Sequence, residues 1–349
     1  MTLNQQQIRV LVVDDSAFIR RAVIRMFDGH PVIRIIDVAA DGAMAIDLIK
    51  KLRPDVVTLD VKMPVLDGLA ALARIMKECP TPVIMLSSLT EKGGENTLKA
   101  LELGAVDFID KTAAGGPMDI SGLARELTAK ILVAARVDVL KLRQEEAKPV
   151  AGEMPQVHAA KGTEIVLIGT STGGPPALQT VLGKIPATFP CPILIVQHMP
   201  VGFTASLAER LNRLCAITVK EGVDGEVVQA GCAYLAPGGT HMKLKRNCGR
   251  MQIWLDTLPA DALHRPSVDV LFESAAQVCG AATVAVVLTG MGKDGAEGAQ
   301  ALKRLGARVV VEAEQTSIVF GMPKAVMTAV AVDGEIPLHN MAEAIVNMI

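Results

Sequence analysis

Three short apolar segments in the second half of the chain each lead into a polar residue that could take part in catalysis. The first ends at Ser171, the second ends at His198, and the third runs into a glycine-rich turn that contains Asp294. In an open parallel sheet, ligands bind beyond the carboxyl ends of the strands. We therefore expect these residues to lie close together, although more than a hundred positions separate the first from the last. A serine, a histidine and an aspartate so arranged predict a hydrolase with a serine nucleophile.

The segment Gly169-Thr-Ser-Thr-Gly173 fits two different sequence patterns. It matches G-x-S-x-G, in which a sharp turn between a strand and a helix exposes a nucleophilic serine. It also nearly fits a dinucleotide-binding loop, with Gly169, Ser171 and Gly174 in the glycine positions. The next strand ends in Gln197-His198 instead of the carboxylate that holds the ribose in dinucleotide binders, which favours the hydrolase. The order Ser, His, Asp argues against the α/β-hydrolase superfamily, and a domain that binds a nucleotide without catalysis is the alternative.

Acidic residues follow two of the predicted strands in the first half of the chain. Asp14 and Asp15 come directly after the first strand and Asp60 follows the third, while Ser87 ends the fourth strand and Lys111 follows the fifth. Carboxylates that meet at one edge of a sheet repel each other and need a cation, and hard oxygen ligands suit Mg²⁺. A carboxylate beside Mg²⁺, an ammonium and a hydroxyl could accept a phosphoryl group, because these groups neutralise the transferred charge.

The apolar patterns predict the elements that must position these residues. Five predicted strands cover 8–13, 32–38, 55–59, 82–86 and 106–109, and the helices between them cover 16–27, 43–52, 69–77 and 96–103. This alternation predicts a parallel sheet with helices on both faces, the α/β class. A long helix is predicted over 119–146, followed by an interdomain linker over 148–162 that collects Pro, Gly and Ala. A second α/β domain is expected from Glu164 to the end.

Composition limits the class of protein. The 349 residues are 50% hydrophobic and only 3% aromatic, which predicts two domains with aliphatic cores. A net charge of −2 gives no electrostatic reason to expect nucleic acid or a membrane surface, and the second half shows no basic recognition helix. The first residues do not form a signal peptide and no apolar run approaches the ~18 residues of a membrane span. Six cysteines without a C-x-x-C pair predict reduced thiols, so we expect a cytoplasmic protein.

The first half of the chain resembles the receiver domain of bacterial response regulators over roughly residues 8–125. The matching segments are Val12-Val-Asp-Asp-Ser16, Leu59-Asp-Val-Lys-Met-Pro64, Ser87-Ser88 and Asp110-Lys111. The resemblance implies a flavodoxin-like, five-stranded parallel sheet. It implies these roles: phosphorylation of Asp60, Mg²⁺ binding by Asp14, Asp15 and Asp60, and switching by Ser87, Phe108 and the phosphate-contacting Lys111. Thr112 stands where receivers usually carry a proline, so a cis peptide bond is not expected there.

The second half is similar to the CheB family of chemotaxis methylesterases over about residues 163–347. The matching segments are Gly169–Gly174, Gln197–Pro200, Ala236–Met242, Arg265–Asp269 and Leu288–Gly295. The resemblance implies that Ser171 is the nucleophile, His198 the general base and Asp294 the residue that orients it. It divides the chain into a receiver domain (8–125), a linker made of a helix and a flexible stretch (126–162) and a doubly wound catalytic domain (163–349). We interpret His241 and His264 as structural or close to the substrate.

The two resemblances together imply a phosphorylation-activated hydrolase. Its substrates would be glutamate γ-methyl esters, and also glutamines, on the cytoplasmic helices of methyl-accepting chemoreceptors, and a chemotaxis histidine kinase would donate the phosphoryl group. Backbone N–H groups near Thr172 or Met291 would stabilise the oxyanion, and the esterase reaction would need no cofactor. We also hypothesise that the unphosphorylated receiver covers the Ser171 site and that phosphorylation of Asp60 releases it.

Overall fold

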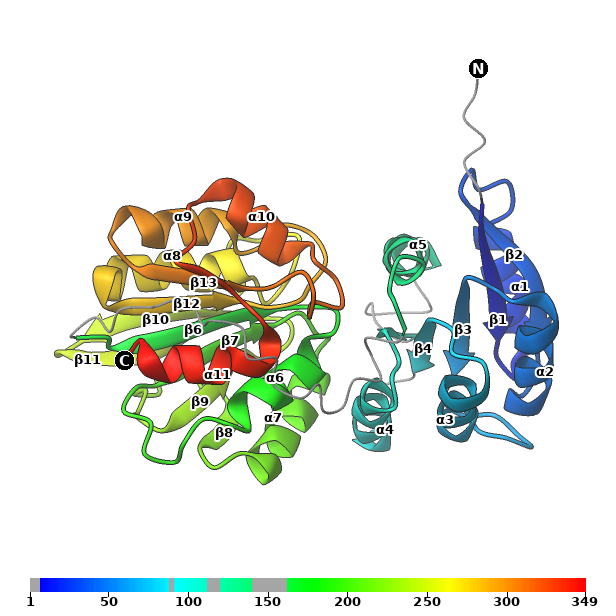
Figure 1. The fold of residues 1–349 in the computed structure, drawn as a ribbon, viewed down its shortest axis with the longest axis horizontal. Helices are drawn as coiled ribbons and strands as arrows, with labels where there is room; N and C mark the ends of the chain where they lie inside the picture. The colour runs from blue at the N-terminus through cyan, green and yellow to red at the C-terminus, as the bar shows by residue number, and fades with distance from the viewer. Residues whose placement is uncertain (1–6, 88–90, 112–119, 140–161) are drawn as a thin grey trace, which may run out of the picture. The chain divides into compact units, whose positions relative to one another are not determined.

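The computed structural model describes residues 7–87, 91–111, 120–139 and 162–349. The chain forms two compact units, Met1–Glu146 and Ala147–Ile349, and each has its own sheet (Figure 1). The long apolar runs read from the sequence form the central strands of these sheets, and those strands are fully buried. Continuous burial on both faces is typical of parallel sheets covered by helices.

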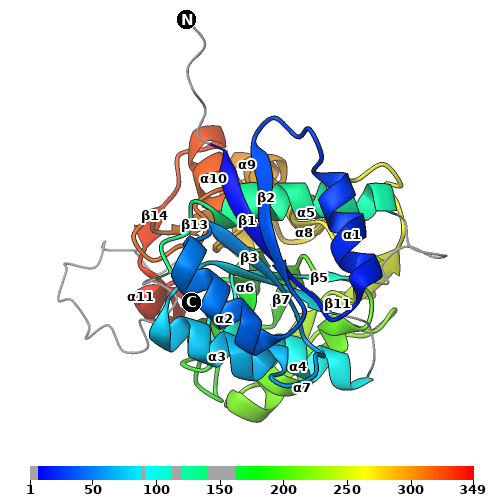
Figure 2. The same ribbon diagram turned by 90° about the vertical axis from the view of Figure 1, so that its right-hand side faces the viewer.

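The first unit is a five-stranded parallel sheet in the order β2-β1-β3-β4-β5. Its strands are β1 (Ile8–Val13), β2 (Ile33–Ala39), β3 (Val56–Asp60), β4 (Val83–Ser87) and β5 (Asp107–Asp110). Its helices are α1 (Ala17–Met26), α2 (Gly42–Leu52), α3 (Gly68–Glu78), α4 (Glu91–Glu102) and α5 (Ile120–Ala134). Helices α1 and α5 pack together, whereas α2, α3 and α4 contact one another in series, so helices cover both faces (Figure 2). The predicted parallel sheet is confirmed, with strand ends within one residue.

Polar residues start three of these helices directly after strands or loops. The side chain of Asp41 accepts hydrogen bonds from Ala43 and Met44 at the start of α2, and Asp67 accepts one from Ala70 at the start of α3. The hydroxyl of Ser16 does the same for α1. Such caps satisfy N–H groups that have no partner within the helix. They therefore fix where the chain leaves the carboxyl edge of the sheet.

Two predicted helices differ from the structure. Helix α4 begins at Glu91, before the predicted start at 96, and it runs through Gly93-Gly94 although glycine has a low helix propensity. The helix predicted over 119–146 ends at Ala134, because the following turn replaces α-helical bonds with shorter-range ones, such as Val137 N–H to the carbonyl of Ala134 at 3.0 Å. The next residues have low helix propensity, and Val139 turns inward and is buried.

Helix α5 belongs to the first unit. Its Leu127 and Ile131 are fully buried in the same core as Val10 and Val12 of β1. The boundary predicted at residue 125 lies within this helix. The helix expected in the linker therefore packs on the first sheet. Of the linker predicted over 148–162, all but Gly162 lies outside the described residues.

The second unit is a seven-stranded sheet in the order β14-β13-β12-β6-β7-β9-β8, and all neighbouring strands are parallel. Its strands are β6 (Ile165–Thr170), β7 (Ile193–Gln197), β8 (Thr218–Glu221), β9 (Cys232–Leu235), β12 (Thr283–Val287), β13 (Arg308–Glu312) and β14 (Gly334–Ile336). Its helices are α6 (Gly174–Leu182), α7 (Phe203–Leu214), α8 (Val268–Cys279), α9 (Ala296–Arg304), α10 (Met322–Ala329) and α11 (Leu338–Asn347), with the short 3₁₀ helix η2 (Gly280–Ala282). The predicted doubly wound class is confirmed.

The strand order of the second unit reverses beside β6. The chain passes from β6 to β7 on one side and returns later to β12 on the other, so the carboxyl end of β6 is a topological switch point. Helices α6, α7 and α11 form one layer, and α8, α9 and α10 form another (Figure 1). An open α/β sheet binds its ligands at such a reversal of strand order.

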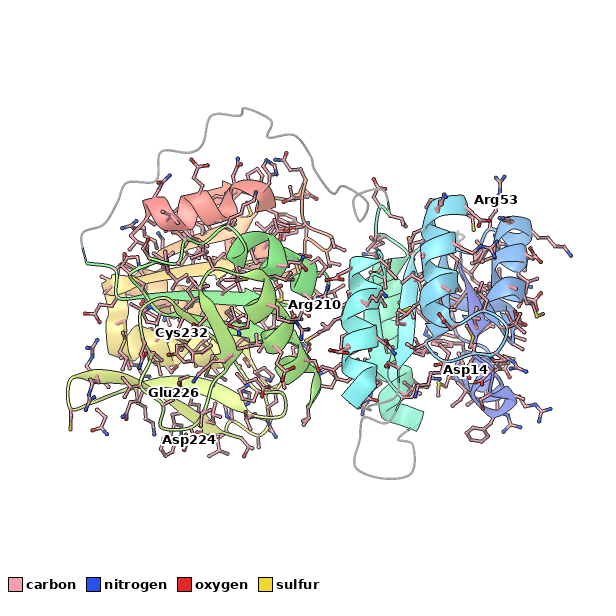
Figure 3. All side chains as sticks on the ribbon, turned by 90° about the horizontal axis from the view of Figure 1, so that it is seen from below. Asp14, Arg53, Arg210, Asp224, Glu226 and Cys232 are labelled. Carbon is pink, nitrogen blue, oxygen red and sulfur yellow. The ribbon has the colours of Figure 1, made fainter. Side chains whose placement is uncertain are left out.

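An antiparallel hairpin, β10 (His241–Asn247) and β11 (Arg250–Asp256), packs on α8. The segment that contains Asp224 and Glu226 runs alongside it, since the N–H of Leu255 donates to the Asp224 carboxylate and that of Ile253 to the Glu226 carbonyl, both at 2.8 Å (Figure 3). Among the described residues of both units, no helix combines the length and apolar character needed to cross a membrane.

We predict that Gly68→Ala destabilises the first unit by about 1–3 kcal/mol, because overpacking forces the backbone apart. A Cβ atom at Gly68 would lie 2.0 Å from the carbonyl oxygen of Asp60, where no flexible side chain could move aside. Denaturant unfolding of the full chain measures the loss. In the control Gly29→Ala, the new Cβ meets nothing within 4 Å and only the positive φ of 69° is strained. An equal loss in both variants would contradict the steric explanation.

Candidate active site

Ser171 and His198 follow neighbouring strands of the second sheet. Thr170 and Gln197 are paired in the register of β6 and β7, and the N–H of His198 continues the ladder by donating to the carbonyl of Thr170 at 3.1 Å. Because neighbouring strands lie about 4.8 Å apart, the next residues along, Ser171 and His198, lie side by side. Asp294 lies in the turn after β12, which pairs with β6 from the other side. The structure thus brings the three residues to one switch point.

The carboxylate of Asp294 binds His198 and the start of helix α8. Its Oδ2 lies 2.7 Å from Nε2 of His198 and accepts the N–H of Val268 at 2.7 Å. Its Oδ1 accepts the hydroxyl of Ser267 and the N–H of Asp269, both at 2.9 Å. Burial alone would raise the pKa of Asp294, but the hydrogen bond of His198 and those of the backbone N–H groups lower it well below its ordinary value. The carboxylate is therefore ionised, next to a helix N-terminus that favours negative charge.

The second nitrogen of His198 is left for another partner. Because Nε2 faces a carboxylate, it carries the proton, and Nδ1 is the acceptor of the neutral ring. Nδ1 is buried and has no hydrogen-bond partner among the described residues. A basic nitrogen so placed beside a serine can take the hydroxyl proton when the serine attacks an acyl group.

His241 and His264, the two other histidines in the family-like motifs, lie in different surroundings. His264 stacks on His198, with ring centroids 4.1 Å apart and ring planes inclined by 21°. His241 is fully buried, with Nε2 3.3 Å from the carbonyl oxygen of Pro259, and burial lowers its pKa. His264 therefore lies against the proposed base, whereas His241 is part of the packing.

The side chain of Gln197 connects the turns that carry Ser171 and His198. Its Nε2 donates to the carbonyl of Ser171 at 2.9 Å and to that of His198 at 3.1 Å. A Cβ atom at position 174 would lie 1.9 Å from Oε1 of Gln197, so only Gly174 leaves room for this bridge. Gly173 has a φ of 79°, which favours glycine, and α6 starts directly afterwards. Gly173 and Gly174 therefore each have a structural reason at the turn that carries Ser171.

The backbone before Met291 lies against the nucleophile. A Cβ atom on Gly290 would lie 2.9 Å from Cβ of Ser171. The N–H groups of Thr172 and Met291 belong to the two segments that flank Ser171 on this side. Their role as oxyanion donors stays a prediction.

The first unit gathers the predicted acidic residues at the carboxyl edge of its sheet. Asp14, Asp15 and Asp60 each place a carboxylate oxygen within 4.8 Å of the others. Asp14, which is labelled in Figure 3, is fully buried. The ammonium of Lys111 lies 2.8 Å from Asp14 and 2.7 Å from Asp60. Burial raises the pKa of Asp60, and the hydrogen bond from Lys111 offsets part of that rise. A set of oxygen ligands beside a lysine fits a hard divalent ion such as Mg²⁺.

The remaining predicted residues of the first unit lie on the neighbouring strands. The buried hydroxyl of Ser87 accepts a hydrogen bond from Thr97 of α4 at 3.0 Å. Phe108 is buried in β5, with the ammonium of Lys130 5.3 Å from its ring centroid. Thr112, which replaces the usual proline, lies outside the described residues.

Both units match known families. The CheB methylesterase family model matches residues 166–345, and the response regulator receiver domain model matches residues 10–118. A protein-glutamate methylesterase/protein-glutamine glutaminase of Geobacillus kaustophilus is 46% identical over 344 residues, which cover 98% of this chain and 99% of that protein. The chain belongs to the CheB methylesterase family.

Other CheB relatives agree with this assignment. A protein of the same name from Halalkalibacterium halodurans is 46% identical over 343 residues, covering 98% of each chain. The crystal structure of the Thermotoga maritima CheB methylesterase catalytic domain is 43% identical, with a TM-score of 0.53, and covers 54% of this chain and all of that one. Both resemblances read from the sequence are confirmed, as is the response-regulator class of the first unit.

Two residues that contact Asp294, Ser267 and Asp269, also belong to the site, although they were not predicted from the sequence. Ser267 and Asp269 lie in the Arg265–Asp269 motif, where a serine before an apolar helix signals an N-cap. Asp269 accepts the N–H of Gly298 at 2.7 Å, yet burial and the neighbouring charge of Asp294 raise its pKa to about 7. The pKa values of two neighbouring carboxyl groups are thus driven apart: that of Asp294 is lowered and that of Asp269 is raised, so Asp269 is the group that takes up a proton first as the pH falls.

We predict that Asp269→Asn makes the protein more stable at pH 8 but not at pH 4. The folded pKa is raised, so the stability that the protonated form contributes is complete below the unfolded pKa of about 4 and is lost as pH rises towards about 7. Asparagine keeps an acceptor for Gly298 and cannot ionise. The expected gain at pH 8, after solvent screening, is on the order of 1 kcal/mol, measured by denaturant unfolding.

The exposed Asp261 offers a matched control for this experiment. Asp261→Asn should shift the stability little at either pH. A loss of stability at pH 8 in Asp269→Asn would contradict the assignment of the proton to Asp269.

Proposed function

We propose that this CheB family member cleaves glutamate γ-methyl esters with Ser171 as nucleophile, His198 as general base and Asp294 as the residue that orients the base. The orientation of the His198 ring supports this most directly. Its Nε2 is 2.7 Å from Asp294, while its Nδ1 is buried, without a partner in the described residues, on the strand end next to Ser171.

In the proposed reaction, Oγ of Ser171 bonds to the ester carbonyl carbon while its proton passes to Nδ1 of His198. The carbonyl electron pair moves to oxygen, and N–H groups of Thr172 or Met291 would stabilise that oxyanion, each worth about 10²–10³-fold. The oxyanion collapses, the C–O bond to the methoxy group breaks, and His198 returns the proton so that methanol leaves. Water then cleaves the acyl-serine by the same proton transfers. A glutamine substrate would follow the same path and release ammonia.

The relatives named above supply the substrate class, since both are named protein-glutamate methylesterase/protein-glutamine glutaminase. We extend both activities to this chain. The substrates would be methylated glutamates, and glutamines, on the cytoplasmic helices of methyl-accepting chemoreceptors, which requires a cytoplasmic enzyme. No partner among nucleic acids and no insertion into the membrane is proposed.

The receiver domain would control this activity through Asp60. We propose that Asp60 takes a phosphoryl group from a histidine kinase: its carboxylate oxygen bonds to phosphorus as the bond to the donor nitrogen breaks. Asp14, Asp15 and Asp60 would hold Mg²⁺, which neutralises phosphoryl charge when bound. The ammonium of Lys111, already 2.7 Å from Asp60, would contact the phosphoryl oxygens, with Ser87 as the switch hydroxyl and Phe108 as the switch aromatic.

Ser171→Ala should lower methanol release from a methylated receptor by at least about 10⁴-fold, because the acyl-enzyme cannot form. Labelling of Asp60 by a phosphodonor should be unchanged. The control Ser206→Ala changes a half-buried serine of α7 and should retain full activity. Methanol release above about 1% of the wild-type rate in Ser171→Ala would rule out Ser171 as the nucleophile.

A chain that starts at Gly162 should release methanol faster than the unphosphorylated full chain, because the receiver can then no longer cover the site. A small-molecule phosphodonor should stimulate the full chain, and Asp60→Asn should abolish that stimulation. Equal or lower activity of the shortened chain would count against autoinhibition and leave the esterase assignment intact.

A further inference from the structure

Thr289, the second residue after β12, is hydrogen-bonded to three consecutive residues around the nucleophile. Its carbonyl accepts the N–H of Ser171 at 3.1 Å and the hydroxyl of Thr170 at 2.9 Å. Its own hydroxyl donates to the carbonyl of Thr172 at 2.9 Å, since its single proton goes to this nearer oxygen and not to that of Val319 at 3.4 Å. The turn from 170 to 172 is therefore held at each residue by Thr289.

Thr289 is itself held in place from the opposite side. Its N–H donates to Oε2 of Glu312, a fully buried residue at the end of β13, at 2.8 Å. Its hydroxyl oxygen accepts the N–H of Val319 at 3.0 Å. Thr289 is 1% exposed, so each of these bonds lies where an unmade bond would leave a buried polar group without a partner. The set has little freedom to rearrange.

We infer that Thr289 is a positioning residue for Ser171, acting through its hydroxyl as well as its backbone. This inference rests on the proposed function, in which Ser171 is the nucleophile. The carbonyl of Thr289 holds the N–H of Ser171 and its hydroxyl holds the carbonyl of Thr172, so the peptide units on either side of the Ser171–Thr172 peptide are both held by Thr289. The Ser171–Thr172 peptide itself carries the N–H of Thr172, a proposed oxyanion donor. A misplacement of about 1 Å at a reacting group costs about 10²-fold in rate.

Thr289→Val removes the hydroxyl and keeps the branched shape and the backbone carbonyl. We expect kcat for methanol release to fall by about 10–100-fold, with KM changed by less than about twofold. Thr289→Ser retains the hydroxyl and should restore kcat to within about threefold of wild type. The matched control is Thr283→Val: Thr283 is buried at the other end of β12, and its hydroxyl has no hydrogen-bond partner in the described part of the chain. This control should leave kcat and KM unchanged.

The same assay on Ser171→Ala separates this inference from the proposed function. If Ser171→Ala still releases methanol, the proposed function fails. If Ser171→Ala is inactive while Thr289→Val keeps kcat within twofold of wild type, only the positioning role fails. An equal loss in Thr289→Val and Thr289→Ser would also overturn it, since the hydroxyl would not be the cause. Thr289→Cys serves if valine reduces the yield of folded protein, and its kcat should lie between those of the serine and valine variants.

Discussion

The hydrogen bonds of the ionised Asp294 carboxylate are the interactions on which the site in the second unit depends. This carboxylate would be costly to bury without partners, but it accepts hydrogen bonds from one side chain and two backbone groups of the α8 N-terminus in addition to that of His198. Ser267 takes part twice, because its hydroxyl donates to Asp294 and accepts the N–H of Val270 as the cap of α8. The start of the helix and the place of the carboxylate are therefore set together. Through Asp294 they also set which ring nitrogen of His198 carries the proton.

Each unit buries a carboxylate near the carboxyl ends of its strands, but the pKa is raised in the first unit and lowered in the second. Asp60 is the last residue of β3 and Asp294 lies in the turn after β12, each near a reversal of strand order. Asp60 accepts one backbone N–H and one ammonium, which do not outweigh burial, so its pKa is raised. Asp294 accepts more donors, including two N–H groups of a helix N-terminus, and its pKa is lowered. The charge of Asp14 raises the pKa of Asp60 further, whereas the hydrogen bond of His198 is the largest effect that lowers the pKa of Asp294. An additional cation would therefore stabilise the ionised form of Asp60, while the neighbours of Asp294 already stabilise its ionised form.

The sequence predicted the sheets and the placement of the site well, because both follow from short apolar runs. Strands such as β6 and β7 are buried on both faces and end directly before Ser171 and His198, so their pattern carries the position of the polar residue after them. The end of α5 was less readable from the sequence, since it is followed by a turn and by the buried Val139, and burial is a tertiary effect. The ring orientation of His198, the raised pKa of Asp269 and the contacts of Thr289 depend on residues distant in the chain. Patterns within one segment do not contain that information.

The bridge made by Gln197 has a consequence for how precisely the second site is built. Both protons of one planar amide are bound to the carbonyls of Ser171 and His198. Because both bonds start at one nitrogen, the two carbonyl oxygens are held at the separation set by the two N–H directions of a single amide, and not only by the more variable spacing of two strands near their ends. The Gln197 amide therefore helps to fix the distance between the turn that carries the nucleophile and the turn that carries the base. Gly174 leaves room for the Gln197 side chain, so it contributes to the geometry of the site as well as to the turn after Ser171.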